Sequence, residues 1–131
     1  MGDGQQTRDF TFVSDVVDAI LTAAASDISG EIFNVGSGRD PVAINYLVEL
    51  LGAKKTTYIP KRPGEPDTTW ADVSKIRTKL NWQAKVPIEQ GVKVMLENSH
   101  YWKEAPVWTP ETIAEATQTW FKCLGTESTT L

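Results

Sequence analysis

Apolar residues recur at the three- and four-residue spacing of amphipathic helices in several stretches of the chain. This pattern predicts helices over about 15–26, 45–51, 72–80, 87–102 and 109–124. Between them, runs rich in β-branched and aromatic residues predict strands over about 7–13, 31–35, 56–60 and 68–71. Short strands separated irregularly by helices indicate an α/β fold. The strands are too few for a self-contained doubly wound sheet, so the chain is predicted to be part of something larger.

Polar residues mark where these helices are expected to begin. Ser14, Asn45 and Asp72 precede helical runs and offer a side-chain oxygen to the first backbone amides. Thr109 combines a cap oxygen with a following proline, and Pro87 fits the first turn of the helix before it. The chain therefore encodes a helix start near each of these residues.

Composition places the chain among ordinary folded domains. It has 131 residues, of which 40% are hydrophobic and 23% charged. One compact domain with a real core is expected over 1–125, followed by a disordered Ser/Thr-rich tail over 126–131. The net charge is −4, so the chain lacks the broad positive potential that dominates affinity for nucleic acids. No nucleic-acid partner is therefore expected.

Signals for export or membrane insertion are missing from the sequence. No apolar run approaches the roughly 20 residues that a membrane helix needs, and no basic segment leads into an apolar stretch at the N-terminus. The single cysteine, Cys123, has no partner for an internal disulfide. These features predict a reducing, cytoplasmic location and no membrane partner.

Residue types that often carry catalysis are sparse. His100 is expected on the surface near a helix end, and Cys123 is expected to be a buried small hydrophobe. One cysteine and one histidine are too few for a zinc site. Gly36-Ser37-Gly38 resembles the start of a dinucleotide fingerprint, but Pro41 takes the third glycine position and lacks the amide that phosphate needs. No catalytic, metal-binding or cofactor-binding residue is therefore expected here.

Arg8, Arg62 and Glu65 are the candidate substrate-binding residues. Arg8 lies at the mouth of the first predicted strand, while two prolines and a glycine predict a loop over 61–67 that holds Arg62 and Glu65 rigidly, with Asp67 at its end. Arginine binds phosphate oxygens bidentately, and a carboxylate accepts the paired hydroxyls of a ribose. Together the residues fit a nucleoside diphosphate.

A structural alternative stays open for the same residues. In it Arg8 pairs with Asp9 or Asp15, and Arg62 and Glu65 form an exposed ion pair that contributes little to stability. Spacing alone does not separate the two interpretations.

Several motifs, in order, give the chain a family resemblance. The run from Gly2 to Val17, with Arg8-Asp9-Phe10 at its centre, resembles the opening of the C-terminal part of extended short-chain dehydrogenase/reductases, the NAD-dependent sugar epimerase/dehydratase family. Further similar motifs lie, in family order, at 33–38, 62–65, 71–75, 80–82 and 87–92. The resemblance covers about residues 2–104, whereas 105–131 match no pattern of the family.

The resemblance implies the C-terminal substrate-binding part of such an enzyme, without its N-terminal Rossmann portion. It implies that Arg8 contacts the diphosphate of a nucleoside diphosphate sugar, and that Arg62 and Glu65 contact phosphate and ribose. Asn34 would be structural, supporting a sheet edge. The loop at 62–65 is most similar to that of 4-epimerases acting on UDP-glucose or UDP-glucuronate; dTDP-glucose 4,6-dehydratases are the alternative. In the parent enzyme NAD would be the cofactor.

Departures from the family limit what the chain is expected to do alone. The glycine-rich cofactor fingerprint is missing, and so is the Tyr-x-x-x-Lys pair, because Tyr46, Tyr58 and Tyr101 are followed at that spacing by other residues. Without that tyrosine, no group accepts the proton of the sugar hydroxyl. We therefore expect a noncatalytic fragment that binds no NAD alone, pairs with a Rossmann portion and self-associates in its absence.

The aromatic residues near the C-terminus admit two interpretations. Trp102, Trp108, Trp120 and Phe121 either form a partner surface, which would make the chain a noncatalytic interaction module, or pack the last two helices together. Packing is the preferred interpretation.

Overall fold

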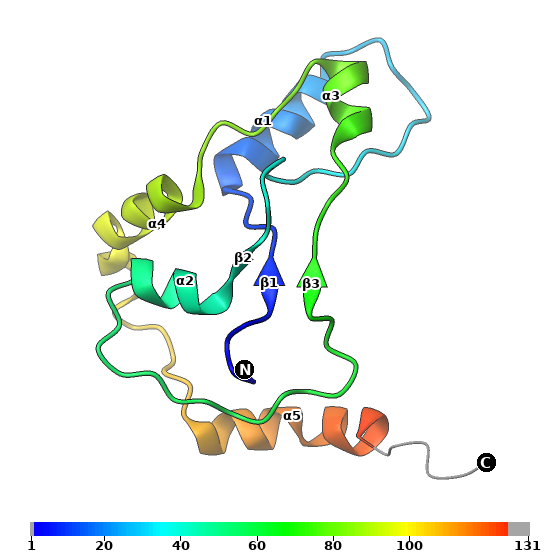
Figure 1. Cartoon of the computed structure of the whole chain (residues 1–131). Helices are drawn as coiled ribbons and strands as arrows, with labels where there is room; N and C mark the ends of the chain where they lie inside the picture. Colours follow the sequence, from blue (N-terminus) through cyan, green and yellow to red (C-terminus); the bar gives the residue numbers. More distant parts are fainter. Residues whose placement is uncertain (1, 126–131) are drawn as a thin grey trace, which may run out of the picture.

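The α/β fold expected from the sequence is confirmed by a computed structural model, which describes residues 2–125 (Figure 1). Its elements are β1 (Thr7–Arg8), α1 (Val13–Ala24), β2 (Val42–Ala43), α2 (Ile44–Leu50), β3 (Thr68–Thr69), α3 (Ser74–Leu80), α4 (Ile88–Glu97), the 3-10 helix η1 (Ser99–Trp102) and α5 (Pro110–Leu124). The predicted tail over 126–131 lies outside the described residues. No helix in the described part is long and apolar enough to cross a membrane.

A small three-stranded sheet of order β2-β1-β3 lies at the centre of the fold (Figure 1). β1 pairs antiparallel with β2 and parallel with β3, with Arg8 opposite Val42 on one side and Thr69 on the other. The backbone amide of Thr7 also donates to the carbonyl of Asp67 at 2.8 Å. The sheet therefore fixes Arg8 beside the end of the 61–67 loop, although about 60 residues of chain separate them.

The core lies where α1 and α3 meet the segment that follows α3. Ala19, Ile76 and Trp82 form a buried apolar cluster. The indole N–H of Trp82 donates to Asp18 Oδ2 at 2.9 Å. Asp15 is only 3% exposed, and its carboxylate accepts a hydrogen bond from the backbone amide of Val86 at 2.9 Å. Two carboxylates of α1 thus anchor the 82–86 segment.

The core is smaller than the composition predicts. The chain exposes 9965 Å², whereas a compact protein of its mass exposes about 6,900 Å². Apolar side chains contribute to the exposed surface, because α1 turns Val13, Val17, Ile20 and Leu21 outward, each at least 48% exposed. The elements lie around the sheet rather than over it (Figure 1). An apolar face of α1 is therefore open to solvent.

Two of the predicted strands were wrong. The 31–35 and 56–60 segments do not form strands, and Ile32 and Tyr58 within them are 84% and 62% exposed. A strand needs a neighbour for its backbone hydrogen bonds, and β-propensity alone does not supply one. No strand of the described part pairs with either segment. Both segments run as connections.

Several helix boundaries also differ from the prediction. α1 begins one residue before Ser14, with Phe12 at the N-cap, and α2 begins before Asn45; neither start has a side-chain cap bond. The predicted 87–102 helix divides into α4 and η1 at Asn98. The Thr109 cap is confirmed, since its hydroxyl accepts the amide of Thr112 at 3.3 Å.

Candidate functional site

The 62–65 turn owes its shape to local sequence. The amide of Glu65 donates to the carbonyl of Arg62 at 3.3 Å, and Gly64 has a φ of +72°. Proline at the second position and glycine at the third suit this turn, because proline presets a negative φ and glycine accepts a positive one. The turn therefore brings the side chains of Arg62 and Glu65 to the same place.

Arg8 and Arg62 converge on a single carboxylate. Glu65 Oε1 accepts from Arg8 Nη2 at 3.2 Å and from Arg62 Nη2 at 3.3 Å, while its Oε2 accepts from Arg62 Nε at 3.4 Å. The Glu65 side chain is 14% exposed, and those of Arg8 and Arg62 are 21% and 26% exposed. The structure thus brings together all three residues that the sequence singled out.

The backbone orients Arg8 toward this cluster. Its Nη1 donates to the carbonyl of Thr7 at 2.7 Å and to that of Asp67 at 3.4 Å. The alternative pairing of Arg8 with Asp9 or Asp15 was wrong, because both carboxylates accept backbone amides elsewhere. The Arg62–Glu65 ion pair does form, but on a carboxylate that is mostly shielded from water.

The cluster carries excess positive charge. Hydrogen bonds from Arg62 hold the pKa of the Glu65 carboxyl below its ordinary value, against the opposing effect of burial. Two guanidinium groups therefore share one ionised carboxylate. The neighbouring Lys61 and Asp67 pair with each other and add no net charge. This arrangement can bind an anion with planar, bidentate donors.

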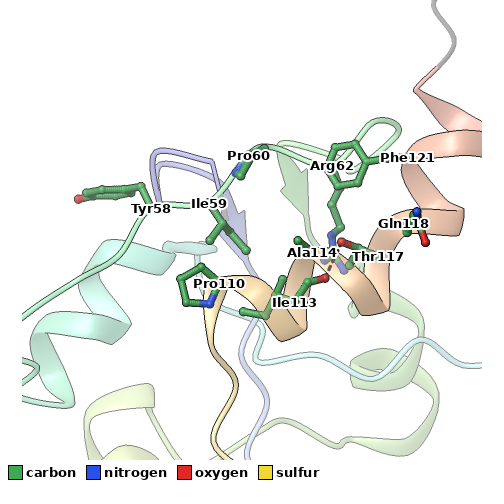
Figure 2. Close-up of a pocket in the computed structure, with 10 residues that line it drawn as sticks. All are labelled: Tyr58, Ile59, Pro60, Arg62, Pro110, Ile113, Ala114, Thr117, Gln118 and Phe121. Carbon is green, nitrogen blue, oxygen red and sulfur yellow. Dashed lines mark hydrogen bonds between the residues drawn. The ribbon is translucent and has the colours of Figure 1, made fainter.

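Two hollows adjoin the cluster. One, of about 400 Å³, has Glu65 in its wall, together with Lys61, Asp67 and the N-terminal turn. The other, of about 450 Å³, lies between the 58–62 segment and α5 (Figure 2). In Figure 2 the Arg62 side chain extends toward α5, beside Thr117. The first hollow offers polar contacts, and the second is mainly apolar.

The turn at Gly36-Ser37-Gly38 does not fit a dinucleotide. The Ser37 amide already donates to Asp9 Oδ1 at 2.9 Å. A Cβ on Gly36 would lie 2.5 Å from Asp9 Oδ2 and 2.7 Å from the Cβ of Ala71, so glycine is needed here for close packing. The chain's own carboxylate thus takes the place that a phosphate would need, and these residues do not suit NAD.

The remaining candidates take structural roles or none. The His100 ring contacts that of Tyr101, with ring centroids 4.1 Å apart and the planes tilted by 37°. The expectation for Cys123 was wrong, because this residue is exposed on α5. Asn34 donates to the carbonyl of Asp72 at 3.3 Å, which is a structural contact, but the expected sheet edge was wrong because neither residue lies in a strand. Among residues 2–125, no cluster of three or more His, Cys, Asp or Glu side chains could hold a metal.

Sequence reasoning missed the contact of Trp120 with the 62–65 turn. The indole N–H donates to the carbonyl of Pro63 at 2.8 Å, and the Arg62 guanidinium carbon lies 5.2 Å from the ring centroid. Trp102 and Trp108 are 65% and 64% exposed, so the predicted packing of the last two helices through these aromatic residues was wrong. No sequence signal links Trp120 to a turn 57 residues away.

Comparison with known proteins points to one family. The family model described as GDP-mannose 4,6-dehydratase matches residues 1–95. The UDP-glucuronate 4-epimerase of Thermodesulfobacterium geofontis is 38% identical over an alignment of 97 residues, and the match covers 70% of this chain and 30% of that protein. The family model therefore covers the sheet, the 62–65 turn and most of the helices, but not α5.

Solved structures of nucleotide-sugar epimerases are also similar to this chain. The Thermotoga maritima UDP-glucose 4-epimerase with UDP-glucose superposes with a TM-score of 0.68 at 36% identity, over 77% of this chain and 34% of that chain. The Bacillus cereus UDP-glucuronic acid 4-epimerase with UDP-glucuronic acid and NAD gives 0.66 at 32% identity, over 77% and 34%. The chain spans about a third of the length of these relatives.

Proposed function

Because the chain belongs to the GDP-mannose 4,6-dehydratase family of nucleotide-sugar epimerases and dehydratases, we propose that it is the substrate-binding portion of an NAD-dependent nucleotide-sugar 4-epimerase. The proposed substrate is UDP-glucose or UDP-glucuronate. The observation that carries the proposal is the convergence of Arg8 and Arg62 on Glu65 at the 62–65 turn.

Arg8 and Arg62 are proposed to bind the diphosphate. Their shared partner holds the two guanidinium groups close together before any ligand arrives, so little side-chain entropy remains to be lost on binding. Phosphate oxygens would then replace Glu65 as acceptors. The displaced carboxylate of Glu65 borders the 400 Å³ hollow, where it can accept the paired hydroxyls of a ribose.

The chemistry itself is assigned to the rest of a longer enzyme. This chain has no Tyr-x-x-x-Lys pair, and its Gly36-Ser37-Gly38 turn does not suit a dinucleotide. NAD, bound by the remaining portion, would supply the hydride chemistry at the sugar. The described residues bind and orient the nucleotide.

The open face of α1 is proposed to contact that remaining portion. Val17, Ile20 and Leu21 are exposed at helical spacing on one face of the helix, and contiguous exposed apolar faces mark protein–protein contact sites. In the absence of the remaining portion, the same face favours self-association. A reducing compartment stays a prediction that rests on the single cysteine.

Calorimetric titration of the chain with UDP tests the proposal. Arg8→Lys keeps the charge but removes the planar fork, and Arg62→Ala removes both. Losing a guanidinium contact to phosphate costs about 1.5–3 kcal/mol, or at least about tenfold in affinity. Arg39→Ala is the matched control, because Arg39 is exposed and lies outside the cluster.

The choice of ligand separates the alternatives. Both site variants should bind UDP more weakly than the wild type does. Their affinity for uridine, which has no phosphate, should be unchanged. Equal UDP affinities for the wild type and the variants would overturn the diphosphate role. Tighter binding of dTDP than of UDP would favour a dTDP-glucose 4,6-dehydratase. Binding of neither nucleotide would favour a noncatalytic interaction module.

A further inference from the structure

Helix α5 lies outside the part of the chain that matches the family model, yet it contacts the 62–65 turn. Trp120 donates its indole N–H to the Pro63 carbonyl at 2.8 Å, and its ring lies beneath the Arg62 guanidinium. At the end of the helix, Leu124 Cδ1 would lie 3.7 Å from a Cβ atom added to Gly64. Three successive residues of the turn therefore face α5.

We propose that Trp120 is a positioning residue, which holds the 62–65 turn and the Arg62 guanidinium ready for the diphosphate of the substrate. The inference rests on the proposed function and extends it to a helix that the family model does not match. Trp120 touches no substrate in this proposal and acts through Arg62 and Pro63.

The turn needs such support because its side-chain bonds between Arg62 and Glu65 are the ones that a phosphate would displace, which leaves little else to hold it. A single backbone hydrogen bond of 3.3 Å closes it. Pro63 has no backbone N–H to donate, so its backbone is held through its carbonyl, which accepts the indole N–H of Trp120. Arginine also loses much rotamer entropy when its side chain is held in one orientation. Contacts that hold both the backbone and the guanidinium lower the entropy lost when a ligand binds.

Trp120 differs from Glu65 as a partner of Arg62. Glu65 accepts the same N–H groups that a phosphate would accept, so ligand binding competes with it. The ring of Trp120 attracts the guanidinium through its π face and leaves the N–H groups at the edge of the guanidinium available. Arg62 can therefore stay on the ring when phosphate displaces Glu65.

The contact with the turn can be tested without a ligand. Amide hydrogen exchange is measured for residues 61–67 in the wild type, Trp120→Phe and Trp120→Leu, with Trp108→Leu as the control because Trp108 is exposed outside α5. Trp120→Leu should accelerate exchange in the turn about two- to tenfold, while the amides of α1 and α3 and the Trp108→Leu protein stay unchanged. Unchanged exchange in the turn would overturn the proposal.

A double-mutant cycle tests the action through Arg62. Trp120→Leu should weaken UDP binding about two- to fivefold in the wild-type background, and should add no further loss in Arg62→Ala. Trp120→Phe, which keeps a π face but has no N–H, should fall between the wild type and Trp120→Leu. An equal loss in both backgrounds would show a general structural effect and overturn the positioning role. If the wild type binds no UDP, the proposed function fails. The exchange measurement still tests whether Trp120 holds the 62–65 turn.

Discussion

Glu65→Gln is the most direct test of the charge arrangement at the candidate site. Glutamine keeps the shape of the side chain but replaces the carboxylate that Arg8 and Arg62 share. Hydrogen bonds to charged groups contribute about 1.5–3 kcal/mol each. The three side chains are 14–26% exposed, so water screens part of this interaction energy. The glutamine side chain also keeps one oxygen that can accept a hydrogen bond from an arginine. We therefore expect a loss of about 1–2 kcal/mol in the free energy of unfolding at pH 7.

The pH dependence of this loss adds a sharper criterion. Folding lowers the pKa of Glu65, because Arg62 hydrogen-bonds to its charged form. The stabilisation is then fully present above pH about 4.3, the ordinary pKa of glutamate, and is lost as the pH falls through the lower folded-state pKa. The difference between Glu65→Gln and the wild type should shrink below pH about 4.3.

Urea unfolding followed by tryptophan fluorescence gives the required free energies, since Trp82 is buried and reports on the core. Both proteins are measured from pH 7 down to pH values below the ordinary pKa of glutamate. Asp67→Asn is the control, because its carboxylate is 80% exposed and should matter little. Equal stability of Glu65→Gln and the wild type at pH 7, or a difference that persists undiminished in acid, would refute the reasoning.

Other predictions concern the fold and its open surface. Gly36→Ala should cost about 1–3 kcal/mol in urea unfolding, because the added methyl overlaps Asp9. Asp15→Ala should cost about 1–3 kcal/mol in the same assay, because it leaves the Val86 amide without its acceptor; wild-type stability would contradict the role of Asp15. Sedimentation velocity should show concentration-dependent self-association that Ile20→Lys reduces; a wild type that stays monomeric at high concentration would argue against an open interface.

Local chemistry in the sequence was enough to predict part of the fold and to single out the three residues that the structure brings together in the candidate site. Helical periodicity located the helices, and a threonine followed by a proline located the start of α5. Proline and glycine at 63–64 predicted the turn that carries Arg62 and Glu65. Such features depend on neighbours within a few residues, so they can be read along the chain.

Tertiary structure alone decided how these parts meet. The β1–β3 pairing, not spacing, brought Arg8 to Glu65 across 57 residues. The 31–35 and 56–60 segments stayed outside the sheet because a strand exists only where another backbone pairs with it. Trp120 reached Pro63 across a similar distance in sequence. These contacts depend on the packing of distant segments, which periodicity, caps and turn residues do not encode.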